Sequence, residues 1–165
     1  IRDRSTVEEV QATYQFNDLT SFLAVYYPAM DVLQDEDDFH DLAAAYFERA
    51  RANGVVRAEC FFDPQAHTTR GIAIETVIRG YHRAVVEARE AGLSADLILC
   101  FLRDMSAQSA LETLQAALPY KDMFIGVGLD SDERDNPPTK FAEVFALARE
   151  AGLHVTMPCD IDQVG

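Results

Sequence analysis

The chain has 165 residues, of which 48% are hydrophobic and 25% are charged, a composition typical of one folded globular domain. Collagen-like, low-complexity and disordered classes are excluded, and no apolar stretch approaches the roughly 20 residues of a membrane span. The formal net charge of −14 would repel nucleic-acid phosphates and anionic lipids, so we expect no nucleic acid or membrane partner, a small-molecule ligand and a cytoplasmic location.

Residues 5–33 are predicted to be helical and carry aromatic side chains at helical spacing. Phe16, Phe22 and Tyr26 belong to this aromatic cluster. Two interpretations stay open: the cluster packs in the core, which is the commoner fate of such a stripe, or it closes over a planar base. The acidic residues 35–38 that follow are interpreted as a solvated helix start rather than a metal site.

From residue 34 onward, helices and strands alternate. Helices are predicted over 39–54, 71–91, 106–118 and 138–151, and strands over 55–62, 96–102, 123–129 and 153–157. The strands are continuously apolar and their connections are long enough for crossovers, which favours a parallel sheet over hairpins. We therefore predict an α/β fold with about four parallel strands and flanking helices.

Local motifs for several common chemistries are missing from the sequence. Cys60, Cys100 and Cys159 are too far apart for a zinc knuckle or a readable disulfide framework, and the first two are predicted to be small buried side chains in strands. No GxGxxG loop follows a strand, and no GxSxG or HExxH occurs. Charged and turn-forming residues instead follow each predicted strand, at the edge where parallel sheets build their sites.

Two of these strand ends are specific enough to suggest a family. Residues 61–71 (FFDPQAHTTRG) and 127–141 (VGLDSDERDNPPTKF) resemble the second and fourth strand ends of the bacterial adenine deaminases, in the adenosine deaminase branch of the amidohydrolases. Residues 16–23 (FNDLTSFL) are similar to that family's helical segment over the purine pocket. The resemblance implies a (β/α)₈ barrel of the TIM type that holds one zinc, uses zinc-activated water to replace the 6-amino group of a purine, and releases ammonia.

The resemblance covers about the middle half of such an enzyme. It implies one partial-barrel domain over residues 1–165, with 1–33 as the helical segment over the purine pocket and 34–165 as the alternating helices and strands. The family takes an HxH pair of zinc ligands from its first strand, a catalytic histidine from its sixth and an aspartate ligand from its eighth. None of these strands is recognised in the sequence.

The family's fifth strand reads His-Ala-Gly-Glu, in which the histidine binds zinc and the glutamate donates a proton to the purine ring. Pro158 stands at the ligand position and Ile161 at the acid position. Neither side chain can perform that role, although Asp160 or Asp162 could replace the acid through a shifted backbone. We expect the chain alone to bind no zinc and to have little or no activity, as a truncated or inactive form.

A polar group directly after a buried strand has few structural reasons to exist, and the family places its purine contacts after the strand that ends near residue 129. Asp132 departs from the commoner Ser-Ser-Glu pattern by adding a charge, which leaves the exact base specificity open. The predicted substrate-binding residues are Asp130, Ser131, Glu133, Asp63, Phe16 and Phe22.

Simpler interpretations remain for neighbouring residues. Asp63 either lines the pocket or only forms a turn with Pro64. His67 is expected on a solvated loop, and Arg70 is expected to pair with a nearby carboxylate. The histidines predicted to be structural or solvent-facing are His40, His82 and His154.

A non-catalytic scaffold is the alternative to an enzyme. Four parallel strands leave two open edges and an apolar face that a single chain cannot cover. Such a half-barrel would close by forming a homodimer or by binding a complementing barrel fragment.

Overall fold

The computed structural model describes residues 6–13 and 15–157. The four strands of its one sheet are β1 (Arg57–Phe62), β2 (Ser94–Leu102), β3 (Gly126–Asp130) and β4 (His154–Val155). They are parallel and lie side by side in the order of the sequence. The fold class is therefore α/β with four parallel strands and flanking helices, as predicted.

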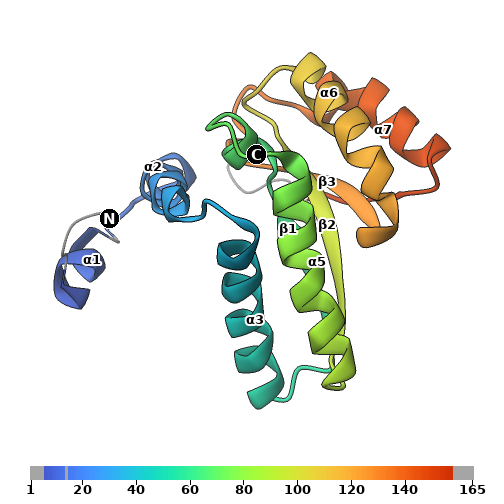
Figure 1. Ribbon diagram of the computed structural model, residues 1–165. Coiled ribbons are helices and arrows are strands. Elements are labelled where there is room, and N and C mark those ends of the chain that lie inside the picture. The colour runs from blue at the N-terminus through green and yellow to red at the C-terminus, as the bar shows by residue number, and fades with distance from the viewer. Residues whose placement is uncertain (1–5, 14, 158–165) are drawn as a thin grey trace.

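Helical segments connect each strand to the next (Figure 1). These connections are α4 (Gln65–Thr68) and α5 (Ile74–Glu90), then α6 (Ala107–Ala117) and the 3₁₀ helix η2 (Leu118–Met123), then the 3₁₀ helix η3 (Pro138–Phe141) and α7 (Ala142–Glu150). Before β1 lie α1 (Val7–Thr13), α2 (Leu19–Ala29), the 3₁₀ helix η1 (Met30–Val32) and α3 (Glu36–Ala52). Both views show α3 beside α5, and α1 and α2 standing away from the sheet.

Capping explains where two of these helices begin. The Asp35 side chain accepts hydrogen bonds from the backbone N–H groups of Asp37 and Asp38, so the acidic run starts α3, as predicted. The Ser109 N–H donates to Ser106 Oγ over 3.1 Å at the start of α6. Sequence-local hydrogen bonds therefore set both starting points.

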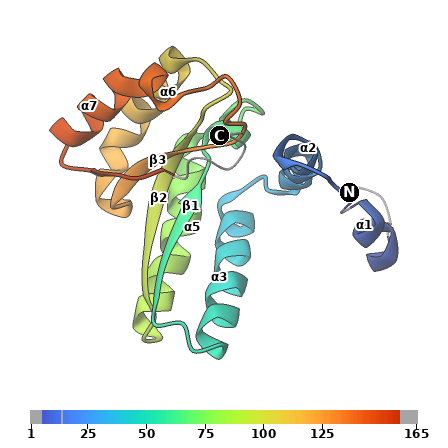
Figure 2. The same ribbon diagram turned by 180° about the vertical axis from the view of Figure 1, so that it is seen from behind.

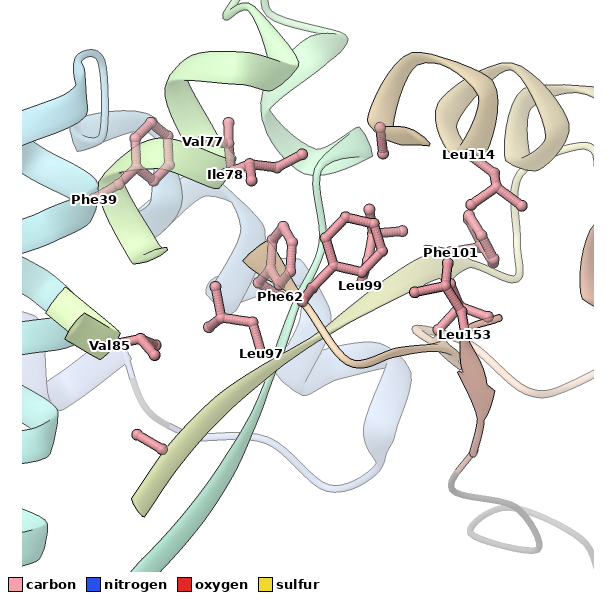
Figure 3. Close-up of a cluster of buried hydrophobic side chains, with 14 of the residues drawn as sticks. Phe39, Phe62, Val77, Ile78, Val85, Leu97, Leu99, Phe101, Leu114 and Leu153 are labelled. Carbon is pink, nitrogen blue, oxygen red and sulfur yellow. The ribbon is translucent and has the colours of Figure 1, made fainter. Parts of the chain in front are cut away.

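The hydrophobic core lies between the helices and one face of the sheet. Leu97, Leu99 and Phe101 alternate along β2 and are buried against the helices, as Figure 3 shows with their neighbours from α3 and α5. The two helices approach each other closely at Gly80, where a Cβ would lie 2.6 Å from the Glu36 carbonyl oxygen. This close approach packs α3 against α5, and α5 in turn packs against β2.

The opposite face of the sheet is concave and carries polar as well as apolar side chains. In Figure 2 the strands β1 and β2 lie in front of α5. Arg57, Glu59 and Phe61 of β1 line a hollow of about 390 Å³ on this face, together with Gly126 and His154. Every second strand residue therefore points to the side that the interior of a closed barrel would occupy.

Several predicted boundaries need correction. β1 begins at Arg57 rather than at residue 55, and β3 begins at Gly126 rather than at residue 123, which is the last residue of η2. β4 is only two residues long, and the predicted helix over 138–151 begins as the 3₁₀ helix η3. The N-terminal segment is not one helix, since Asp18 caps a separate α2. No helix in the described residues has the length and apolar character needed to cross a lipid bilayer.

Candidate active site at the carboxyl edge of the sheet

Three ligand-type side chains meet where β1, β2 and β3 approach their carboxyl ends. Asp63 follows β1, Asp130 ends β3, and Cys100 points from β2 to the same concave face. A carboxylate oxygen from each aspartate and the Cys100 Sγ all lie within 4.8 Å of one another. Gly128 leaves room for this group, because a Cβ there would lie 3.0 Å from the Cys100 Sγ.

The environment of this cluster favours the protonated forms of its acids. Burial, with the nearby Asp130 and Asp104, raises the pKa of Asp63 to about 8. Burial also raises the pKa of Asp130, although the Ser131 N–H and Arg103 oppose that shift. At neutral pH the Asp63 carboxyl therefore carries its proton and can donate a hydrogen bond, while Asp130 remains the better acceptor.

The buried Asp63 Oδ1 at this edge has no hydrogen-bond partner among the described residues. The Ser131 side chain is a hydrogen-bond partner of the Tyr27 hydroxyl in α2. Ser131 is only 6% exposed and adopts a left-handed backbone with a φ of 78°, which is uncommon for a residue with a Cβ. Its N–H donates to Asp130 Oδ1 over 2.8 Å. Unsatisfied buried polar atoms and an unusual backbone are both more frequent at functional sites than elsewhere.

Gln65 links the carboxyl ends of the strands to one another and to α6 through two side-chain hydrogen bonds. The side chain is 1% exposed, and its Oε1 accepts the Leu102 N–H over 2.8 Å at the end of β2. Its Nε2 donates to Ser109 Oγ in α6 over 2.7 Å. The turn after β1 is therefore joined to β2 and to α6, which limits the movement of Asp63.

His67 is buried, and the expectation of a solvated loop was wrong. It belongs to α4, is 3% exposed, and packs edge-on against the Phe39 ring at 4.8 Å. Arg70 Nη2 lies 2.9 Å from the His67 Nδ1, which must be the acceptor because a guanidinium only donates. Burial and the Arg70 charge lower the pKa of His67 to about 4, so the ring is neutral at pH 7.

Arg70 pairs with a carboxylate, as predicted, but it does more. Its Nε lies 3.3 Å from Asp31 Oδ1. Its Nη2 also donates to the carbonyl oxygens of Met30 at 3.2 Å and Leu33 at 3.0 Å. Arg70 therefore holds the segment between α2 and α3 against the turn that follows β1.

The aromatic cluster of α2 is not part of the core. None of the residues of α2 is buried, and Phe16, just before it, is 43% exposed. Phe16 and Phe22 meet edge-to-face with ring centroids 5.0 Å apart. The Thr20 hydroxyl donates to Asp132 Oδ2 over 2.9 Å, which links α2 to the loop after β3. The rings of Phe16 and Phe22 are therefore accessible near the carboxyl ends of the strands and are not packed in the core.

The described residues do not match the histidine-rich metal site that the resemblance implies. Asp63, Cys100 and Asp130 form the only group found there that could hold a metal ion, and it contains no imidazole. His40 lies on α3 and His82 on α5, away from the strand ends, as predicted. His154 is the first residue of β4 and lies at the amino-terminal ends of the strands, opposite the candidate site, also as predicted.

Pro158, Ile161, Asp160 and Asp162, on which the loss of the family's ligand and acid was predicted, lie outside the described residues. The predicted purine contact Glu133 lies within them, is 4% exposed, and forms an ion pair with Arg103. These assignments stay predictions.

Sequence reasoning missed Cys100, Gln65 and Arg103 as parts of this edge. Cys100 was interpreted only as a small buried side chain, and the structure confirms that it is buried, whereas Cys60 is half-buried. The alternation of side chains along β2 could have indicated the position of Cys100. In the strand register, Cys100 pairs with Gly128 and Leu102 pairs with Asp130, so Cys100 and Leu102 share one face of the sheet. Nothing local in the sequence indicates the contacts of Gln65 and Arg103, which join separate strand ends.

Comparison with known proteins agrees with this picture. The family model described as "Adenosine deaminase" matches residues 2–159. The adenine deaminase of Geotalea uraniireducens is 58% identical over 151 residues, which cover 91% of this chain and 42% of that protein. The chain thus spans less than half the length of the curated relatives that it matches.

Solved structures give the same partial coverage. The crystal structure of the adenine deaminase from Arthrobacter aurescens superposes with a TM-score of 0.90 at 48% identity, over 93% of this chain and 47% of that one. An amidohydrolase from Burkholderia ambifaria, solved with bound Zn, gives a TM-score of 0.77 at 28% identity over 92% and 43% of the two chains. The four strands therefore correspond to part of a TIM-type amidohydrolase barrel.

Proposed function

The chain belongs to the adenosine deaminase family, and from that membership we propose that it is the central part of an adenine deaminase. The reaction would replace the 6-amino group of the purine by oxygen and release ammonia. Adenine is the favoured substrate, because adenine deaminases stand among the relatives at about half identity or more. Within this reaction, the described residues would form one wall of the base pocket.

The buried Asp63 carboxyl, whose Oδ1 has no hydrogen-bond partner among the described residues, carries this proposal. A purine edge offers ring nitrogens that accept and N–H groups that donate hydrogen bonds, and enzymes that bind single bases read these edges with polar groups beside aromatic rings. A protonated Asp63 would donate, and Asp130 would accept. Phe16 and Phe22 would supply aromatic surface next to the base.

The remaining chemistry would come from residues outside the described part. The resemblance implies a zinc ion, which would supply an activated water as the nucleophile. The cluster of Asp63, Cys100 and Asp130 lacks the imidazole ligands for it, so we assign it to binding the base and not the metal. For the 165 residues alone we therefore propose little or no turnover and no zinc site of the family type.

The roles of the two parts of the domain follow the same proposal. Residues 1–33 would lie over the pocket, supported by the Thr20 to Asp132 hydrogen bond, and residues 34–165 would form the partial barrel. The cytoplasmic location stays a prediction from composition. Self-association and binding of a complementing fragment also stay predictions.

A chimera tests the proposal without relying on the activity of a partial barrel. Residues 6–157 of this chain replace the corresponding residues of the Geotalea uraniireducens relative, so the positions of Pro158 and Ile161 keep the relative's own residues, and zinc content, ammonia release and the ultraviolet spectrum of adenine are measured. We expect turnover of adenine above that of adenosine and N6-methyladenine. A folded, zinc-loaded chimera that is silent with all three would contradict the proposal. Turnover by the 165 residues alone would contradict the view that their site is incomplete.

A further inference from the structure

We infer that Arg103 is a positioning residue of the proposed site, because its buried guanidinium holds the loop over residues 131–136 in the shape in which the Ser131 N–H donates to Asp130 Oδ1. The inference rests on the proposed function in one respect, since it takes this loop as a wall of the base pocket. The evidence for the positioning itself lies in contacts of the loop and is independent of any ligand.

The charge of Arg103 is buried together with its partner. Arg103 directly follows β2 and is 2% exposed. Its Nη1 lies 3.5 Å from Glu133 Oε1, and the exposed fractions of the two side chains are 3% and 5%. A buried charge is strongly unfavourable unless it is paired and hydrogen-bonded, so neither member can be removed alone without penalty.

Arg103 contacts the loop at its start, middle and end. Its backbone N–H donates to the Asp130 carbonyl oxygen over 2.9 Å, where β3 gives way to the loop. Glu133 is the contact in the middle. At the end, Arg103 Nε donates to the Asn136 carbonyl oxygen over 3.0 Å. The side chain and the backbone N–H of Arg103 therefore contact the loop at three places along its length.

The loop needs such support because its backbone is unusual. Ser131 and Asp135 have φ values of 78° and 62°, in the left-handed region that residues with a Cβ rarely adopt. The Asn136 amide nitrogen donates to the carbonyl oxygens of Asp132 and Arg134 over 3.1 and 2.9 Å. Conformations of this kind persist only where several surrounding contacts determine them together.

Lys140 closes the arrangement from the other side. Its Nζ donates to the Arg103 carbonyl oxygen and to Asn136 Oδ1, each over 2.9 Å. Among the described residues, the buried Arg103 Nη2 has no hydrogen-bond partner. A phosphate oxygen could accept a hydrogen bond from it. The Glu133 carboxylate lies against the same guanidinium and would repel an anion, so positioning fits the charges better than phosphate binding.

The test compares amide hydrogen exchange in the wild-type chain and in Arg103→Gln, with Arg149→Gln on the exposed surface of α7 as the matched control. In Arg103→Gln we expect the amides of residues 131–136 to exchange at least about tenfold faster, since hydrogen bonds to a charged group are lost, while α5 keeps its protection. Arg103→Lys should recover part of the protection. The control should match the wild type throughout.

A second variant guards against misfolding. Arg103→Met combined with Glu133→Gln removes both charges, so no unpaired charge stays buried, and the loop should still exchange faster. Unchanged loop protection in the folded double variant would overturn the inference. An equal rise in exchange across α5 and the loop would also overturn it, by showing a general loss of stability.

Titration with adenine and AMP separates the remaining outcomes. If the wild type binds adenine, Arg103→Gln should weaken the binding of both ligands by a similar factor. A selective loss of AMP binding would assign the residue to a phosphate and overturn the inference. If the wild type binds neither ligand, the proposed base site fails in this chain, whereas the exchange measurement still decides the positioning role.

Discussion

The Asp63 carboxyl after β1 lies beside the Asp130 carboxyl at the end of β3, with an oxygen of each within 4.8 Å of the other and of the Cys100 Sγ. These two acids come from strands that are not neighbours in the sheet, so the parallel arrangement with β2 between them is what brings them together. Because of their burial, Asp63 is a hydrogen-bond donor and Asp130 an acceptor at neutral pH.

Asp63→Asn should change how stability depends on pH. The pKa of Asp63 rises on folding from 3.8 to about 8, so between these values the folded chain holds a proton that the unfolded chain has released. Its contribution to stability is complete below this window and is lost as the pH rises through it. We expect Asp63→Asn to melt higher than the wild type at pH 8 and similarly at pH 4. A difference in melting temperature that does not vary with pH would contradict the assignment.

The histidines should titrate in a defined order by NMR. Hydrogen bonds from Glu87 and Asp41 raise the pKa of His40, and burial lowers that of His82. Burial and Arg70 lower the pKa of His67 to about 4. The His67 ring signal should therefore stay that of a neutral imidazole when His40 and His82 have titrated, and stability should fall as the pH drops from 6.5 toward 4. An ordinary titration of His67 near 6.5 would disprove its buried placement.

Gln65→Leu should destabilise the fold by about 1–3 kcal/mol, because it leaves the buried Leu102 N–H without an acceptor. Gln108→Leu on α6 is the matched control. Gln108 only donates to Glu112 on the exposed surface, so the change should stay within about 0.5 kcal/mol. Urea unfolding followed by circular dichroism measures both. Equal effects of the two substitutions would show that the link between strand ends contributes little.

Arg70→Met should release the segment between α2 and α3 and leave the sheet intact. The substitution removes the hydrogen bonds to the Met30 and Leu33 carbonyl oxygens. Limited proteolysis should then cut this segment faster, while amide exchange in β2 stays unchanged. Arg49→Met, on the exposed surface of α3, should behave as the wild type. Unaltered cleavage in Arg70→Met would mean that other contacts hold the segment.

The sequence was sufficient to predict the fold class and the order of the elements from residue 34 onward. Apolar runs separated by amphipathic helices identify a parallel sheet, and strand ends then follow from turn residues such as Pro64. The burial of His67 could not be predicted, because it depends on the position of Phe39 in a different helix. The hydrophobic pattern of a segment indicates which of its faces a residue occupies. It does not indicate which residues of another segment pack against that face.

The site divides in the same way. Asp63 and Ser131 were identified from their positions after strands, and the structure adds that Ser131 is buried and that Asp63 Oδ1 is buried without a partner among the described residues. The ion pair of Arg103 with Glu133 joins residues from two loops, so no periodicity within either loop could have indicated it. Long-range polar contacts of this kind leave no signature in a single sequence.

The measurement that tests the account most directly is steady-state deamination of adenine by the chimera, with Asp63→Ala compared to Glu59→Ala. Both acids belong to the β1 region, but Asp63 lies at the carboxyl edge, whereas Glu59 lies within the strand and pairs with Arg57. We predict that Asp63→Ala lowers kcat/KM by at least about tenfold, as expected for a lost hydrogen bond to the bound base, and that Glu59→Ala changes it by less than about twofold. Equal values of kcat/KM for the two variants would contradict a base-binding wall at this edge of the sheet.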